Sequence, residues 1–317
     1  MSSLTVGVVG VTGYVGGELV RWLLQHPHLQ LASVVGRSAV GRPLADVQPA
    51  LAGLTSLTVQ DFVPAELAKL DVVALATPHG VARHLVPALE AAGARRIVDL
   101  SADHRHAEGW VYGQPEWNAE QLAGATRVAV PGCFATAISL AVAPLVAAGV
   151  VNGPVQVAAI TGSTGSGATP SAGTHHPERF ANVKAYKVLQ HQHVPEIRGF
   201  LASLGTAPTV HFVPASGPFD RGIFATCFVP VAPGIDARAI VVDAYAHHPR
   251  IRIRPGSPEL RYVRGTGFCD LSVHAEDGMA VVLAAIDNLG RGAAAQAVQC
   301  LEHLAGVQTT PISACIP

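Results

Sequence analysis

Short apolar runs alternate with helical patterns over the first 150 residues. Runs rich in β-branched and other apolar residues occupy positions 4–9, 29–35, 71–76, 96–100 and 127–130. Between them, apolar residues recur at helical spacing, as at 81–92. Continuous apolar strands that alternate with helices are typical of a parallel sheet covered on both faces. The pattern therefore predicts an α/β fold whose N-terminal part contains a parallel sheet.

The pattern changes after residue 150. Apolar strands are predicted at 155–160, 223–229 and 279–286, and a flexible loop rich in glycine and serine is predicted at 161–167. Strands that are not separated by regular helical segments favour an α+β domain with a mixed or antiparallel sheet. The last apolar pattern, at 292–304, predicts a helix that packs back on the first domain.

A length of 317 residues also favours two domains, because a single hydrophobic core rarely grows beyond about 250 residues. We expect a nucleotide-binding domain formed by residues 1–133 together with 290–317. Residues 134–289 would then form a catalytic and oligomerisation domain.

A glycine-rich turn joins the first predicted strand to the first predicted helix. Gly10, Gly13 and Gly16 give the spacing G-x-x-G-x-x-G, whereas the common dinucleotide-binding fingerprint is G-x-G-x-x-G. Glycines at such a turn let backbone N–H groups approach a pyrophosphate at the helix N-terminus. A turn that binds nothing is the alternative, but the flanking strand and helix favour a Rossmann-type domain. The candidate cofactor-binding residues here are Gly10, Thr12, Gly13, Tyr14, Val15 and Gly16.

The end of the second predicted strand bears on the choice of cofactor. Folds that select NAD usually place an acidic residue there for the ribose 2′-hydroxyl, but this chain has Arg37 and Ser38. An arginine and a serine can hold a 2′-phosphate instead, which favours NADP over NAD. A solvated loop arginine is the alternative interpretation of Arg37.

Composition and net charge limit the classes of molecule that the protein is expected to bind. Apolar residues make up 49% of the chain and charged residues 14%, and the formal net charge is −1. This balance provides no broad basic field for nucleic acid or an anionic membrane, so a small-molecule ligand is favoured. The chain has no N-terminal targeting pattern and no apolar run of about 18 residues, so we expect a soluble, cytoplasmic protein.

Cysteine supplies the strongest candidate for chemistry. The five cysteines are odd in number and contain no C-x-x-C pair, which argues against a disulfide framework and a thiolate zinc site. Cys133 follows the strand at 127–130 and the helix-breaking pair Pro131-Gly132, and it precedes an apolar helical run. A helix N-terminus stabilises the nucleophilic thiolate. An ordinary buried cysteine is the alternative, but ligands bind at the carboxyl ends of parallel strands.

The residues around Cys133 also resemble a known family. Residues 128–137 and Pro144 are similar to the active-site signature of the N-acetyl-γ-glutamyl-phosphate reductases, which act in arginine biosynthesis and are related to aspartate-semialdehyde dehydrogenase. Further similar segments follow in order along nearly the whole chain, at 13–19, 78–80, 99–103, 191–197, 221–223 and 287–289. The chain departs from the family pattern at His104, His106, Val130 and Gly267, and in a shortened segment at 105–112. Cys133 and the histidine pair at 191 and 193 are retained, so these departures affect the expected details of substrate binding more than the expected type of reaction.

The resemblance implies a reaction and a set of site residues. A small acyl phosphate would be attacked by Cys133, and NADPH would reduce the thioester to an aldehyde. His191 would be the general acid/base, and His193 is the less favoured alternative for that role. The resemblance also implies Asn288 as a late cofactor contact, although this residue could instead cap the following helix. The candidate substrate-binding residues are Arg105 for the transferred phosphate, Ser163 and Gly165 as backbone N–H donors to an oxyanion, His193 and Glu196.

Several alternatives remain at this point. Arg179, Arg198 and Arg221 compete for the substrate carboxylate. The histidine pair at 191 and 193, with those at 175 and 176, could bind zinc, but no carboxylate or cysteine stands at a familiar ligand spacing, so no metal is expected. A reductase of the lysine pathway with a carrier-bound substrate, or a non-catalytic NADPH sensor, are the other functions considered. The resemblance also implies a homo-oligomer, either a dimer or a tetramer, that forms through the sheet of the second domain, and the low charged fraction is consistent with buried interfaces.

Overall fold

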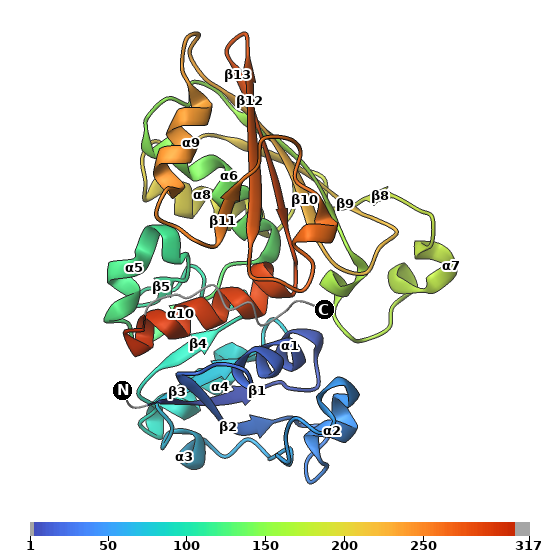
Figure 1. The fold of residues 1–317 in the computed structure, drawn as a ribbon. Helices are drawn as coiled ribbons and strands as arrows, with labels where there is room; N and C mark the ends of the chain where they lie inside the picture. The colour runs from blue at the N-terminus through green and yellow to red at the C-terminus, as the bar shows by residue number, and fades with distance from the viewer. Residues whose placement is uncertain (1–2, 308–317) are drawn as a thin grey trace. The chain divides into compact units, whose positions relative to one another are not determined.

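The computed structural model describes residues 3–307, and the chain divides into two compact units (Figure 1). The first unit contains the chain up to Gly132 and the segment that begins at Ala293, and the second extends from Cys133 to Gly292. Residues 308–317 of the predicted first domain, with Cys315, lie outside the described residues.

The first unit is built on a parallel six-stranded sheet. Its strand order is β2-β1-β3-β4-β6-β5, and every neighbouring pair is parallel. The strands are β1 (Leu4–Val9), β2 (Leu29–Val35), β3 (Val72–Leu75), β4 (Ile97–Asp99), β5 (Val111–Tyr112) and β6 (Arg127–Ala129). β3 is wholly buried, as expected for a strand between two helical layers. The predicted Rossmann-type α/β class is confirmed.

Among the described residues, six α-helices accompany this sheet. They are α1 (Tyr14–Leu23), α2 (Leu44–Val47), α3 (Pro64–Leu67), α4 (Ala82–Ala91), α5 (Pro115–Ala123) and α10 (Ala295–Ala305), and a single 3₁₀ turn lies at Pro49–Leu51. A π-helical turn, Gly290–Ala294, precedes α10. Polar side chains attach α10 to the rest of its unit: Gln296 Nε2 donates to Gly113 O at 2.6 Å, and Glu302 lies 3.2 Å from His26 Nε2.

The second unit is an α+β structure with a mixed seven-stranded sheet of order β11-β12-β13-β10-β7-β9-β8. Most neighbours are antiparallel, but β7 with β9 and β11 with β12 are parallel. The strands are β7 (Val155–Thr161), β8 (Lys184–Ala185), β9 (Val210–Ser216), β10 (Ile223–Pro230), β11 (Ile251–Ile253), β12 (Cys269–Glu276) and β13 (Met279–Ile286). The predicted second sheet is therefore confirmed as mixed.

One apolar helix organises the core of this unit. α6 (Cys133–Ala147) is buried from Phe134 to Val146 and contacts β10 and β13. α8 (His193–Ala202) and α9 (Ala237–Tyr245) pack against α6 and against the same sheet (Figure 1). Buried and more exposed residues alternate along β7 and β10, so one face of the sheet meets these helices. This packing fixes the first turn of α6, where Cys133 lies.

Candidate active site

Cys133 is the first residue of α6 and is partly exposed. The other cysteines among residues 3–307, at positions 227, 269 and 300, are buried. Burial raises the pKa of the Cys227 thiol to about 12, which makes that thiol inert. Cys133 is instead at the N-terminus of a long helix, where the helix dipole favours an anion. Cys133 is thus the described cysteine best placed to act as a nucleophile.

Gly292 contacts Cys133 closely, and the sequence analysis did not select it. A Cβ atom at residue 292 would lie 2.8 Å from Cys133 Cβ. A side chain at this position would displace the cysteine or the backbone that carries it. The close packing of residue 292 against Cys133 at the first turn of α6 therefore requires a glycine.

His191 is buried among aromatic rings, with only 4% of the residue exposed. Its ring lies 5.5 Å from the ring of Phe134 and 5.3 Å from that of Phe212. Burial, followed by the charge of Lys187, lowers the pKa of His191 to about 4. The imidazole is therefore neutral at pH 7.

One hydrogen bond determines which nitrogen of the neutral His191 ring carries the proton. The backbone N–H of His193 donates to His191 Nδ1 at 3.2 Å. Because Nδ1 accepts, the ring proton is on Nε2, which leaves Nε2–H as the donor that His191 can offer.

Tyr186 lies beside His191, and it was not among the site residues predicted from the sequence. Its ring lies 5.8 Å from the ring of His191. Burial raises the pKa of the Tyr186 phenol, the charge of Cys133 raises it further, and Arg179 opposes the shift. Cys133 and Arg179 must both lie within electrostatic range of this phenol. The second unit therefore brings Cys133, Tyr186 and His191 together.

His193 and Glu196 occupy the first turn of α8, and both are buried. The ring of His193 lies 4.6 Å from the ring of His191. These two predicted substrate-binding residues therefore belong to the same part of the fold as His191. Their role as substrate contacts stays a prediction.

The loop after β7 differs from its prediction. The segment expected to be flexible contains a 3₁₀ turn, Ser163–Ser166. Ser163 N donates to Phe219 O at 2.9 Å, and Gly165 N donates to Gly162 O at 3.3 Å. Both N–H groups therefore donate to carbonyl oxygens within the protein, and a cradle of backbone donors from Ser163 and Gly165 for an oxyanion stays a prediction.

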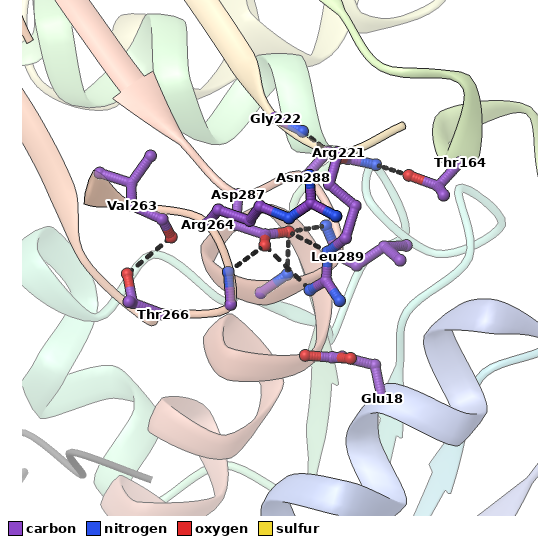
Figure 2. A network of polar contacts seen from close by, with 12 residues as sticks. Glu18, Thr164, Arg221, Gly222, Val263, Arg264, Thr266, Asp287, Asn288 and Leu289 are labelled. Atoms are coloured by element: carbon purple, nitrogen blue, oxygen red, sulfur yellow. Dashed lines mark hydrogen bonds and ion pairs between the residues drawn. The ribbon is translucent and has the colours of Figure 1, made fainter. Parts of the chain in front are cut away.

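Asn288 belongs to a polar network next to this loop (Figure 2). Its Oδ1 accepts from Gly222 N at 2.7 Å, and its Nδ2 donates to Thr164 Oγ1 at 3.0 Å. Capping of the following helical segment, the alternative role for Asn288, is performed by Asp287, whose Oδ1 accepts from Leu289 N and Gly290 N. Asn288 thus binds two loops together, and its contact with a cofactor stays a prediction.

The candidate arginines differ in their partners. Arg221 Nη2 lies 2.9 Å from the fully buried carboxylate of Asp287, and Figure 2 shows this pair at the centre of the network. Arg198 is exposed on α8. Arg179 Nε and Nη2 donate to the carbonyl oxygens of Gly217 and Thr161.

The glycine turn of the first unit has the geometry of a backbone cradle. Gly10 has a φ of +97°, and a Cβ atom at Gly16 would overlap the Gly10 carbonyl. α1 begins directly after Gly13, so the N–H groups of its first turn lack helical partners. Gln48, which the sequence analysis did not select, braces the turn by donating to Val11 O at 2.8 Å. These features fit a bound pyrophosphate.

The remaining predicted cofactor residues surround this turn. Thr12 and Val15 are partly buried, and Tyr14 is 45% exposed at the start of α1. Arg37 and Ser38 follow β2 and are both exposed. A 2′-phosphate could reach an exposed arginine and serine, and their selection of NADP stays a prediction.

The loops at the carboxyl edge of the first sheet support one another. The Asp103 carboxylate accepts from Gly80 N at 2.7 Å, and His79 Nδ1 accepts from Ala102 N at 3.0 Å. Arg105 Nε donates to Val130 O at 2.9 Å and Nη2 donates to Leu100 O at 3.3 Å, which holds this arginine at the ends of β6 and β4. Its predicted contact with phosphate stays a prediction.

Residues 3–307 contain neither a metal-binding cluster nor a membrane-spanning helix. This part of the chain contains no cluster of three or more His, Cys, Asp or Glu side chains that could bind a metal ion. None of its helices combines the length and the apolar character needed to span a membrane.

Comparison with known proteins identifies the family. Residues 5–125 match the semialdehyde dehydrogenase NAD-binding domain, and residues 133–288 match the semialdehyde dehydrogenase dimerisation domain. The chain is 39% identical to the N-acetyl-γ-glutamyl-phosphate reductase of Salinispora arenicola, with 98% of both chains covered. It is 38% identical to that of Nitrosospira multiformis, with 97% of both covered.

A solved structure shows the same fold. Aspartate semialdehyde dehydrogenase II from Vibrio cholerae is 16% identical, with a TM-score of 0.78 over 96% of this chain and 98% of that chain. The matched domains, the glycine turn and the cysteine at the start of α6 are those of a nicotinamide-dependent oxidoreductase. The chain therefore belongs to the N-acetyl-γ-glutamyl-phosphate reductase family of the semialdehyde dehydrogenases.

Proposed function

We propose that this enzyme reduces N-acetyl-γ-glutamyl phosphate with NADPH to N-acetylglutamate semialdehyde and phosphate, as a step of arginine biosynthesis. The observation that carries the proposal is the grouping of a helix-N-terminal cysteine with a buried neutral histidine, with Tyr186 beside the histidine and within electrostatic range of the cysteine. The first unit would hold the nucleotide, with Arg37 and Ser38 at the 2′-phosphate. The second unit would hold the acyl group.

The chemistry assigns one task to each catalytic side chain. The Cys133 thiolate attacks the acyl carbon, and phosphate leaves with the electron pair of the broken C–O bond, which gives a thioester. NADPH, when bound, would supply the hydride that reduces the thioester carbonyl. His191 donates a hydrogen bond from Nε2–H to the oxyanion that develops at this carbonyl oxygen. The C–S bond then breaks with its electron pair on sulfur, which releases the aldehyde and restores the thiolate.

Turnover in the oxidative direction tests the function. Purified enzyme with NADP, phosphate and N-acetylglutamate semialdehyde should form NADPH in a phosphate-dependent reaction, and NAD should support a lower kcat/KM. The N-succinyl aldehyde and the carrier-bound aldehyde of the lysine pathway are the matched comparisons. If none of the aldehydes gives phosphate-dependent NADPH formation, the proposed function is wrong and the sensor interpretation replaces it.

A specific surface favours the lysine-pathway reductase as the second candidate. Phe180 and Val183 are 69% and 60% exposed, and Lys184 and Lys187 beside them are exposed cations. An acidic carrier protein would fit a surface of this kind. Turnover of the carrier-bound aldehyde alone would establish this candidate in place of the first.

We also propose a homodimer formed through the face of the second sheet that the helices leave uncovered. Val213 on β9 pairs with Ala158 on β7, and Ala158 pairs with Thr226 on β10, so these three side chains lie on one face of the sheet. Phe228 is two residues beyond Thr226 on β10 and therefore lies on the same face. Val213 and Phe228 are 38% and 39% exposed, which is unusual for apolar residues inside a sheet. The match to a dimerisation domain supports the same interface.

Placing charges on this face should separate the subunits. The double variant Val213→Asp with Phe228→Asp is expected to sediment as a monomer, because two unpaired carboxylates would be buried at the interface. Leu54→Asp, at a residue that is 59% exposed in the first unit, is the control and should sediment like the wild type. A wild-type monomer at micromolar concentration, or a double variant that stays dimeric, would count against this interface.

A further inference from the structure

Arg179 lies where two parallel strands of the second unit end. Its Nε donates to Gly217 O at 3.0 Å and its Nη2 donates to Thr161 O at 3.2 Å. Thr161 is the last residue of β7, and Gly217 directly follows β9. A guanidinium carries five N–H donors, so two are used by these carbonyl oxygens and three remain. The side chain is thus fixed in position while part of its fork is still available.

The charge of Arg179 has no carboxylate partner among residues 3–307. Other partly buried arginines of the second unit do: Arg221 pairs with Asp287, and Arg252 pairs with Asp270. Arg179 is also partly buried, and this burial lowers the pKa of its guanidinium. A partly desolvated cation that meets only neutral acceptors is costly unless an anion binds to it.

The surroundings of Arg179 are those of the candidate active site. Tyr186 N donates to Pro214 O on β9, the strand whose end Arg179 also contacts. The Tyr186 ring lies 5.8 Å from the ring of His191. The charges of Arg179 and Cys133 both act on the Tyr186 phenol. An anion on Arg179 would therefore be bound next to the residues that handle the acyl group.

We infer that Arg179 binds the carboxylate of the substrate, as the residue that fixes the acyl chain relative to Cys133; this inference rests on the proposed function. Of the three competing arginines, Arg221 is paired with Asp287 and Arg198 is exposed on α8. The carboxylate stays with the acyl chain through the thioester stage, whereas the phosphate leaves. A planar guanidinium that is fixed by hydrogen bonds along one edge can donate two parallel hydrogen bonds to a carboxylate.

The test compares an acid substrate with its neutral analogue. Oxidation of N-acetylglutamate semialdehyde and of its α-carboxamide is measured for the wild type, Arg179→Gln and the matched control Arg198→Gln. The wild type should prefer the acid in kcat/KM by roughly ten- to a hundredfold, as expected for hydrogen bonds to a charged group. Arg179→Gln should lose most of this preference with an unchanged KM for phosphate, and Arg198→Gln should retain it. Arg179→Lys, which keeps the charge without the fork, should be intermediate.

The possible outcomes separate the two levels of the proposal. A wild type with no turnover of the acid would contradict the proposed function, and this inference with it. An active wild type without preference for the acid, or an Arg179→Gln variant that keeps the full preference, would overturn the role of Arg179 alone. A raised KM for phosphate with an unchanged acid preference would assign Arg179 to the phosphate and would also overturn it. Arg179 joins two strand ends, so Arg179→Gln could fail to fold. In that case the preference of Arg179→Lys for the acid over the carboxamide is compared with that of the wild type.

Discussion

Cys133→Ala is expected to lower kcat for acyl-phosphate reduction by about four orders of magnitude or more, because no thioester can form without the thiolate. The substitution removes one sulfur at the first residue of α6, whose following residues are buried in the core. The variant should therefore fold and should still bind NADPH. Single-turnover measurements with saturating NADPH would give the rate, and fluorescence titration would give the affinity for the nucleotide.

A second cysteine provides the control for this prediction. Cys227→Ala removes a fully buried thiol from β10, and it should lower thermal stability while leaving kcat unchanged. A wild-type rate in Cys133→Ala would rule out covalent catalysis at this residue. Equal losses in both variants would indicate a general effect of cysteine removal rather than a nucleophile.

His191→Leu is expected to reduce kcat on the order of a hundred- to a thousandfold, as the loss of one oxyanion donor does in other enzymes. His191→Gln should recover about tenfold of this loss, because an amide N–H can replace Nε2–H as a donor even though it cannot exchange a proton. Comparing kcat for the two variants separates hydrogen-bond donation from general acid/base catalysis. If both variants lose the same activity, proton transfer by His191 is required.

The pH dependence gives a second measure of the same residue. The pKa of His191 is lowered to about 4 by burial and by Lys187, so the imidazole stays neutral as the pH falls through 6.5. Activity that needs the neutral ring is therefore retained below the ordinary histidine pKa and is lost only as the pH approaches 4. A limb near pH 6.5 in the kcat profile that disappears in His191→Gln would show that the ring titrates normally.

Much of the fold was predictable because apolar runs dominate the buried strands. The predicted strands at 4–9 and 29–35 coincide with β1 and β2, and the expected mixed sheet is present. Five described strands were not predicted: the short β5, β8 and β11, and the longer β9 and β12. The β12 sequence alternates Asp270 and Ser272 with apolar neighbours, a period-two signal that a search for continuous apolar runs passes over. β9 contains Pro214, which argues against a strand in sequence.

The site was less predictable because its geometry depends on distant partners. Cys133 followed from its position before an apolar helix, and His191 from the family resemblance. The loop at 161–167 was expected to be flexible, because nothing in its own sequence shows that Thr164 Oγ1 donates to Asp220 O or that Asn288 bonds to it. Tyr186 was not predicted for the same reason: its contacts with Pro214 and His191 exist only in the folded sheet.

The central claim is that Cys133 carries the acyl group, and mass spectrometry of the acylated enzyme tests it most directly. Wild-type enzyme mixed with the acyl phosphate in the absence of NADPH should gain one acyl group, and peptide mapping should place it on Cys133. Adding NADPH should remove the group and release one equivalent of aldehyde. An enzyme that turns over normally with NADPH but shows no adduct, or an adduct on another residue, would contradict this account.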